Sequence, residues 1–215
     1  MNKQDLKLIG AFIDNKNIKE DLNYAHLKED GIYATNTKRA IHFNIPMLNL
    51  DMCVHKKLLA GFANIADKDD EIAIDGFGFI RLGAKTKMNC DNFPDIDYKK
   101  VDFKNVFKTK FDYRISLDEI DDLHFELTQK NCFIDDIHIN PIIEYSSCAR
   151  YEIFFNKQTV IRDKVTNEEK TNTGIAKIIG LVDTEDEKDV VKFTAIVMGR
   201  EFKTKAQEQL LFKMD

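Results

Sequence analysis

The chain has 215 residues, of which 43% are hydrophobic and 32% charged, a composition that suits one or two soluble globular domains. Acidic residues outnumber basic ones by 37 to 32, so the net charge of −5 argues against a generally basic nucleic-acid coat but permits a local basic surface. The sequence shows no signal peptide and no long apolar run, and its four cysteines contain no CxxC pair. We therefore expect a cytoplasmic protein with reduced thiols.

The first hundred residues predict helices that alternate with antiparallel strands. In chain order the elements are a helix over 5–15, strands over 22–28 and 32–45, a helix over 54–66, and strands over 71–75, 77–82 and 85–90. Asp30-Gly31 favours the tight hairpin turn between the first two strands. The order of helix then strands occurs twice, which indicates a weak internal repeat of about 45 residues.

The second half begins with Ser116-Leu117-Asp118-Glu119, a pattern typical of a helix N-terminus with a capping box. It predicts a helix over 117–127. The strands that follow are expected over 133–139, 142–145, 151–155, 159–162, 175–182 and 190–202, with an exposed loop or hairpin tip over 162–173.

Helical spacing also predicts which side chains face the core. They are Leu6, Ile9 and Ile13 in the first helix, Leu58, Phe62 and Ile65 in the second, and Ile120, Leu123 and Leu127 in the third. Helices mixed with antiparallel strands indicate the α+β class. We expect two domains, over 1–104 and 105–202, followed by a C-terminal tail over 203–215.

Chemical motifs are scarce in this chain. The sequence contains no phosphate-binding loop, dinucleotide fingerprint, nucleophile elbow or zinc-binding helix motif, so we expect no cofactor and no metal. Asp135, Asp136 and His138 would alternate on a predicted strand and could hold a cation, which leaves a metal-dependent nuclease or hydrolase as one alternative. The scarcity of motifs favours a non-enzymatic binding protein.

Two segments carry a resemblance to a known family. Ala34-Thr35-Asn36-Thr37-Lys38-Arg39-Ala40 precedes a helix, a hairpin and Asn92-Phe93-Pro94-Asp95. This order resembles a middle domain of the bacterial sliding clamp, the beta subunit of DNA polymerase III, which carries "ATDGHRLA" and "FPDY" segments. Val197-Met198-Gly199-Arg200 is similar to the family's last strand, "VMPMR", with Gly199 in place of its proline.

The resemblance implies a DNA-clamp-like fold of repeated helix-and-strand units without an active site. It also implies a pocket for partner peptides, formed by Thr35, Lys38, Arg39, Ala40, Val197, Met198 and Arg200. Helices of the family line a ring around duplex DNA. The basic residues that could face DNA here are Lys3, Lys7, Lys56, Lys57 and Lys68. The bacterial clamp has three domains per chain and closes as a dimer, so a chain with two domains would need three copies to close a ring of the same size.

Charge is uneven along the chain. Residues 1–100 carry 15 basic and 15 acidic residues, whereas residues 101–215 carry 17 and 22. The predicted helix 117–127 contains five acidic residues and would repel phosphates. The second domain therefore turns this helix away from DNA or does not embrace DNA.

The tail segment Gln209-Leu210-Leu211-Phe212 resembles the short peptide that binds clamps. It would dock into a pocket of its own chain, of a neighbouring copy or of the replicative clamp; the alternative is a terminal segment packed on its own domain. The leading hypothesis is a processivity or scaffold protein of replication or repair, a homo-oligomer with duplex DNA and polymerase or repair proteins as partners. The alternative is a clamp-fold regulatory module that does not encircle DNA and docks to a replicative clamp through its tail.

Overall fold

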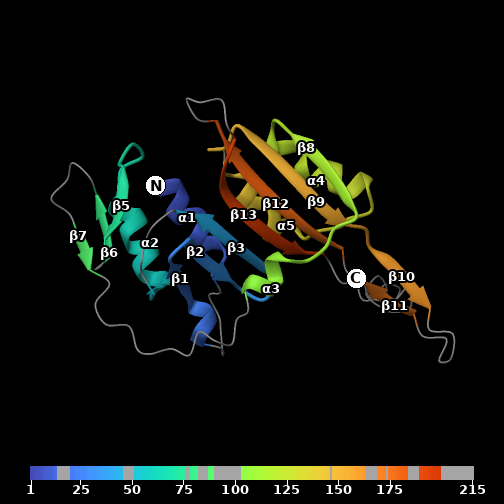
Figure 1. Cartoon of the computed structure of the whole chain (residues 1–215), viewed down its shortest axis with the longest axis horizontal. Coiled ribbons are helices and arrows are strands. Elements are labelled where there is room, and N and C mark those ends of the chain that lie inside the picture. Colours follow the sequence, from blue (N-terminus) through green and yellow to red (C-terminus); the bar gives the residue numbers. More distant parts are fainter. Residues whose placement is uncertain are drawn as a thin grey trace, which may run out of the picture.

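The computed structural model describes residues 1–13, 20–45, 51–75, 78–81, 87–89, 103–145, 147–162, 169–172, 174–183 and 189–199. Within these residues an eight-stranded antiparallel sheet dominates, in the order β4-β1-β2-β3-β13-β12-β9-β8 (Figure 1). Its strands are β1 Tyr24–Lys28, β2 Gly31–Thr35, β3 Arg39–Asn44, β4 Met52–His55, β8 Tyr113–Leu117, β9 Arg150–Asn156, β12 Ile175–Val182 and β13 Val190–Met198. The predicted α+β class is confirmed.

Two smaller sheets lie at opposite ends of the long axis of the molecule (Figure 1). One contains β5 Ile72–Asp75, β6 Gly78–Arg81 and β7 Lys87–Asn89, and the other is the hairpin of β10 Thr159–Arg162 and β11 Glu169–Asn172. The predicted hairpin of strands 71–75 and 77–82 and the predicted strand 159–162 are therefore confirmed, whereas β11 lies within the stretch expected to be an exposed loop or hairpin tip. Among the described residues, no helix has the length and apolar character that a membrane span needs.

The helices are short. They are α1 Lys3–Ala11, α2 Lys56–Ile65, α3 Phe103–Phe107, α4 Leu123–Gln129 and α5 Asp136–Ile143, with 3-10 turns η1 Glu20–Asn23 and η3 Ile120–Asp122. α1 starts with a capping box, because Asn2 accepts from the Asp5 N–H while Asp5 accepts from the Asn2 N–H. His55 caps α2 by accepting from the Lys57 N–H at 3.1 Å.

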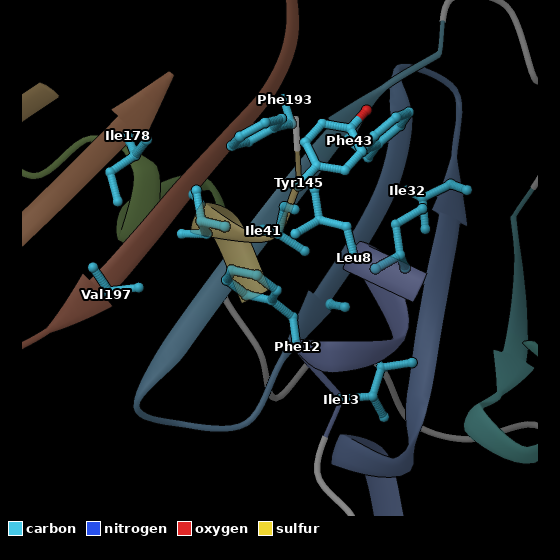
Figure 2. Close-up of a cluster of buried hydrophobic side chains, with 14 of the residues drawn as sticks. Leu8, Phe12, Ile13, Ile32, Ile41, Phe43, Tyr145, Ile178, Phe193 and Val197 are labelled. Atoms are coloured by element: carbon cyan, nitrogen blue, oxygen red, sulfur yellow. The ribbon is translucent and has the colours of Figure 1, made fainter. Parts of the chain in front are cut away.

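Four of these helices cover one face of the large sheet. Strand register puts Ile41, Ala195 and Ile178 side by side on that face, and all three are fully buried. Leu8 of α1 and Phe12, the residue that follows the helix, pack onto this row, as Figure 2 shows. α2 packs on α1, α5 contacts α1 and β13, and α4 contacts α5. Core formation therefore places α1, α2, α4 and α5 in one helix layer.

The opposite face of the sheet is partly covered by α3. Phe103 is buried against Tyr33 and His26, with ring centroids 5.1 and 5.4 Å apart. Farther along, the Lys177 ammonium lies 5.4 Å from the Phe111 ring centroid. The segment from Phe103 to Phe111 thus crosses this outer face from β1 and β2 to β12.

Three predicted elements differ from the structure in the second half. Ser116 lies in β8 and pairs with Glu152, so the predicted capping box is wrong and the helical region begins at Ile120. The predicted strands 133–139 and 142–145 are also wrong, since α5 occupies 136–143. Ile139 and Ile142 are β-branched but lie three residues apart, and burying both against the helix layer overrides their strand propensity.

Two elements of the first half need smaller corrections. The predicted strand 32–45 is two strands, because the Asn36 side chain accepts from the N–H groups of Lys38 and Arg39 and so closes a turn. Residues 54–55 belong to β4, and α2 starts only at Lys56. Ile65, predicted to face the core, is 45% exposed, whereas Leu59 and Ala63 take the inner positions.

The large sheet runs without a break from strands of residues 1–104 to strands of residues 105–202. The joint is the antiparallel pairing of β3 with β13, which matches Phe43 with Phe193 and Arg39 with Val197. The division into two domains and the 45-residue repeat stay predictions.

Candidate functional site

The residues predicted to form a peptide pocket meet at the joint of β3 and β13. Val197 lies opposite Arg39, and the Met198 N–H donates to the Lys38 carbonyl at 2.9 Å. The Thr35 hydroxyl donates to the Arg39 carbonyl at 2.8 Å. Strand pairing therefore brings six of the seven predicted residues together, while Arg200 lies outside the described residues.

Their exposure limits what they can offer to a ligand. Ala40 and Val197 are buried at 4% and 0% exposure. Lys38 is exposed, and Thr35 and Met198 are half-buried. A peptide-binding role for this group stays a prediction.

Arg39 points into the helix layer. One guanidinium nitrogen donates to the Ala11 carbonyl at the end of α1, and the other donates to the Ile137 carbonyl in α5 at 2.5 Å. Residue 141 would donate to Ile137 in a regular helix, but it is a proline and has no N–H. Arg39 therefore supplies the hydrogen bond that Pro141 removes, and it fastens both helices to β3.

The lysines predicted to face DNA divide into two groups. Lys3 donates to the Ala66 carbonyl at 2.8 Å, and Lys56 donates to the Ile13 carbonyl at 3.0 Å. Lys7, Lys57 and Lys68 are exposed. The first group holds α1 and α2 together, while the second group presents charge to solvent.

The exposed surface of α1 and α2 is basic. Asp5 is the only acidic residue in these two helices, and it is completely buried. Lys7 and Lys57 thus stand on helices with no exposed acid. Lys68 differs, because it sits in a turn between Asp67 and Asp69, which offset its charge.

The other end of the helix layer is acidic. Asp121, Asp122 and Asp136 are exposed on η3 and at the start of α5. The same end exposes two apolar side chains, Phe125 at 61% and Ile137 at 71%. Two of the five acids expected on the third helix, Asp118 and Glu119, precede the helical region, whereas Asp121 and Asp122 lie on η3, which contacts α4 and α5 in the same layer as the lysines.

A buried polar cluster links the two halves beneath the helix layer. The Tyr145 hydroxyl donates to Asp5 at 2.5 Å, and the Lys192 ammonium lies 3.4 Å from the same carboxylate oxygen. Burial, followed by the nearby Asp5 charge, raises the pKa of the Tyr145 phenol far above its usual value, so it stays a donor. We call Asp5, Tyr145 and Lys192 the buried triad, of which Asp5 and Tyr145 are buried and the Lys192 side chain is 23% exposed.

A β-bulge directs Lys192 into this triad. Along β12 and β13 the register passes from Phe193 opposite Gly180 to Val191 opposite Leu181, which makes Lys192 the extra residue. A Cβ atom on Gly180 would come within 2.4 Å of the Phe193 ring, so glycine gives the bulge room. Periodicity alone places Lys192 on the outer face, and only the bulge turns it inward.

The residues predicted to hold a cation lie on α5 and at its N-cap. Asp135 and Asp136 lie at the start of α5 and His138 within it, so the strand alternation that suggested a cation site is wrong. His124 contacts Asp136 at 3.2 Å and joins α4 to α5. Burial, then the positive charge of Arg39, lowers the pKa of His138. Among the described residues, no three His, Cys, Asp or Glu side chains gather as metal ligands would.

Two of the described thiols have a raised pKa. Burial raises the pKa of Cys132 to about 12 and that of Cys148 to about 11. Neither therefore forms much thiolate at neutral pH. Cys53 is also a buried free thiol.

Comparisons with known proteins give matches to solved structures. No protein-family model matches the chain, and no curated protein matches its sequence. A solved structure from Eubacterium rectale, described as a "Putative DNA polymerase III beta subunit", is similar over 97% of this chain with a TM-score of 0.44 and 12% identity. This chain spans 65% of the length of that protein. A likeness at this level assigns no activity to this chain.

The buried triad and the Arg39 contacts were not predicted. One signal was present, since Asp5 lies three, four and seven residues before Leu8, Ile9 and Phe12 and so shares their inward helix face. No local signal pairs Arg39 with Pro141, because about a hundred residues separate them. The tail residues Gln209, Leu210, Leu211 and Phe212 lie outside the described residues.

Proposed function

We propose that this protein is a non-enzymatic, DNA-clamp-like accessory protein of replication or repair, which lies on duplex DNA through α1 and α2. The observation that carries the proposal is the exposure of Lys7 and Lys57 on two packed helices without any exposed acid. Two lysines on a regular surface suit non-specific phosphate contacts, which position a protein without reading sequence.

The arrangement of layers supports the same function. A helix layer on one face of a continuous sheet leaves the helices free to meet DNA while the sheet supports them from behind. The sequence resemblance to the sliding clamp adds a mechanism. Several copies around the duplex would hold a bound polymerase or repair protein at high effective concentration by tethering alone.

A second candidate function rests on the acidic end of the helix layer. Asp121 and Asp122 are exposed on the side of the sheet that carries Lys7 and Lys57. Acids at this position repel phosphates and oppose a complete ring around DNA. They favour a regulatory module that keeps the fold, does not encircle DNA and docks to a replicative clamp through residues 209–212.

Duplex binding by the double variant Lys7→Glu, Lys57→Glu tests the proposal. We expect wild-type protein to bind a fluorescent duplex at low salt, and the variant to bind at least about tenfold more weakly. The wild type should also be retained on circular DNA and lost from linear DNA, as a closed assembly requires. The readouts are fluorescence anisotropy across a salt series and gel filtration with circular plasmid.

The matched control is Lys108→Glu with Lys110→Glu, the same change of charge at two exposed lysines that follow α3. This control should bind duplex as the wild type does. Equal duplex affinity of the wild type and the Lys7→Glu, Lys57→Glu variant would show that α1 and α2 do not contact DNA. If the protein were strictly monomeric, bound duplex and were not retained on circular plasmid, the ring would be ruled out and the second candidate function would be favoured.

A further inference from the structure

A row of alternating cations and aromatic rings crosses the outer face of the sheet in the second half. In the register of β8, β9 and β12, Arg114 lies opposite Phe154, and Phe154 lies opposite Lys177. The Arg114 guanidinium is 5.5 Å from the Phe154 ring centroid, and the Lys177 ammonium is 4.6 Å from it. Lys177 also approaches the Phe111 ring, at 5.4 Å. We call these four residues the cation–ring row.

The position of Phe111 at the end of the row is built into the structure. Asn156 of β9 donates to the Lys110 carbonyl at 3.0 Å and accepts from the Asp112 N–H at 2.8 Å. One side chain thus fixes the backbone on both sides of Phe111. Because the ring lies beside Lys177, the row extends past the strands that carry its other members.

The row brings two like charges to one ring. Each cation is attracted to the face of Phe154, but Arg114 and Lys177 also repel each other across it. Glu152 offsets only part of this charge: it accepts from Arg114 at 2.5 Å, but the Arg114 side chain stays 60% exposed and has further N–H donors. The row also lies in the part of the chain that carries the whole net charge of −5. An anionic ligand would relieve the repulsion.

Apolar side chains lie on the same face as the row. Ile175 and Ile179 of β12 lie on the same outer face by strand alternation and are half-buried. In the first half the corresponding face is covered by Phe103, which packs on Tyr33. A half-buried sheet surface with rings and cations offers stacking and apolar contact as well as charge.

We propose that the cation–ring row binds single-stranded nucleic acid. Phosphates would contact Arg114 and Lys177, and unpaired bases would lie on the rings and on the apolar side chains of β12. A duplex presents mainly phosphates and sugars and hides its bases within the stack, so it gains nothing from the rings. The site is separate from α1 and α2, which lie on the other face of the sheet, and it does not depend on the proposed duplex contact.

Two charge-reversed variants with reciprocal expectations test this assignment. The first is Arg114→Glu with Lys177→Glu, and the second is Lys7→Glu with Lys57→Glu. The probes are a fluorescent oligo-dT of about 20 nucleotides and a duplex of the same length, measured by anisotropy in full-length protein. We expect the first variant to lose at least about tenfold in affinity for oligo-dT while duplex affinity is unchanged. The second variant should keep its affinity for oligo-dT.

A conservative variant guards against a misfolded sheet. Arg114→Lys with Lys177→Arg keeps both charges and should bind oligo-dT within about threefold of the wild type. Its normal binding beside the loss in the Glu variant would assign the effect to charge.

Three results would overturn the inference. They are wild-type protein that does not bind oligo-dT at low salt, an Arg114→Glu, Lys177→Glu variant that binds it as tightly as the wild type, and a Glu-rich peptide of equal charge that displaces oligo-dT at equal concentration. The last result would assign the surface to acidic proteins. Loss of duplex binding alone bears on α1 and α2 and leaves this inference standing.

Discussion

The two halves of the large sheet share an architecture but place their charges on opposite faces. Strands β4, β1, β2 and β3 support α1 and α2, while β13, β12, β9 and β8 support α4 and α5 on the same face. In the first half the exposed lysines stand on the helices. In the second half the helices are acidic, and the cations Arg114 and Lys177 cross the outer face of the sheet.

The core requires apolar residues in both halves, whereas the charge of exposed residues can differ between them. Buried positions such as Ile41 and Ile178 are apolar in both halves because one continuous core demands it. Exposed positions carry no such demand, so equivalent layers can differ in charge. Under the two proposals above, nucleic acid would meet the helix face in the first half and the sheet face in the second half.

The buried triad should make the largest contribution to holding the halves together. Asp5 is completely buried and joins α1 to Tyr145 and Lys192 of the second half. We expect Asp5→Ala to lower the free energy of unfolding by about 3–5 kcal/mol, because it leaves a hydroxyl and a partly buried ammonium without their acceptor. Tyr145→Phe should cost less, about 1–2 kcal/mol. Urea denaturation measures both.

The control is Asp69→Ala, which removes a carboxylate from an exposed turn and should change stability by less than about 0.5 kcal/mol. If Asp5→Ala were no more destabilising than this control, the buried triad would contribute nothing measurable to joining the two halves.

Arg39 makes the second connection between the halves. It donates to the Ile137 carbonyl, which lacks its helical donor because residue 141 is a proline. We expect Arg39→Met to cost about 2–4 kcal/mol, because it removes the donor to the carbonyls of Ala11 and Ile137. Pro141→Ala restores an N–H that can bond Ile137 within α5. In that background Arg39→Met should therefore cost less, by about 0.5–1.5 kcal/mol, in a double-mutant cycle.

Additive effects of the two substitutions would contradict this coupling and would leave Arg39 with a role on α1 alone. Gly10→Ala is a useful reference in the same region, because a Cβ atom at Gly10 would meet nothing within 4 Å. It tests whether α1 tolerates substitution when its contact with Arg39 is intact.

Inward positions were easier to predict from the sequence than the elements that carry them. Ile120, Leu123 and Leu127 are buried as their spacing predicts, although α4 begins only at Leu123. Burial follows from composition and spacing, which are local, and the Asp30-Gly31 hairpin is local as well. The incorrectly predicted strand 133–139 shows the limit of local sequence patterns. Residues 136–143 form a helix because Ile139 is buried by packing against other helices, which the local pattern does not contain.

The candidate sites depend on contacts that local patterns do not contain. β3 pairs with β13 across about 150 residues, and this pairing alone brings Lys38 beside Met198. The cation–ring row likewise needs the register of three strands before Arg114, Phe154 and Lys177 become neighbours. The sequence shows that a strand carries a basic residue. It does not show which charged and aromatic side chains become neighbours in the fold, and the class of ligand is inferred from that grouping.

The smallest expected effect tests whether the acidic end of the helix layer also faces DNA. Asp121→Lys with Asp122→Lys replaces two exposed acids by bases on the side that carries Lys7 and Lys57. If duplex DNA passes along the whole layer, as the proposed clamp requires, these substitutions remove repulsion and add attraction. We expect duplex affinity to rise by about three- to tenfold at low salt, and the gain to shrink as salt increases.

Asp118→Lys with Glu119→Lys is the matched control, since these exposed acids precede η3 and lie outside the helices. A gain confined to the Asp121→Lys, Asp122→Lys variant would place DNA along η3 and α4, and would extend the duplex contact from the first half to the second. An equal affinity of this variant and the wild type would mean that duplex touches the first half only. That result would favour the regulatory module that does not encircle DNA, because a ring brings every helix layer near the phosphates.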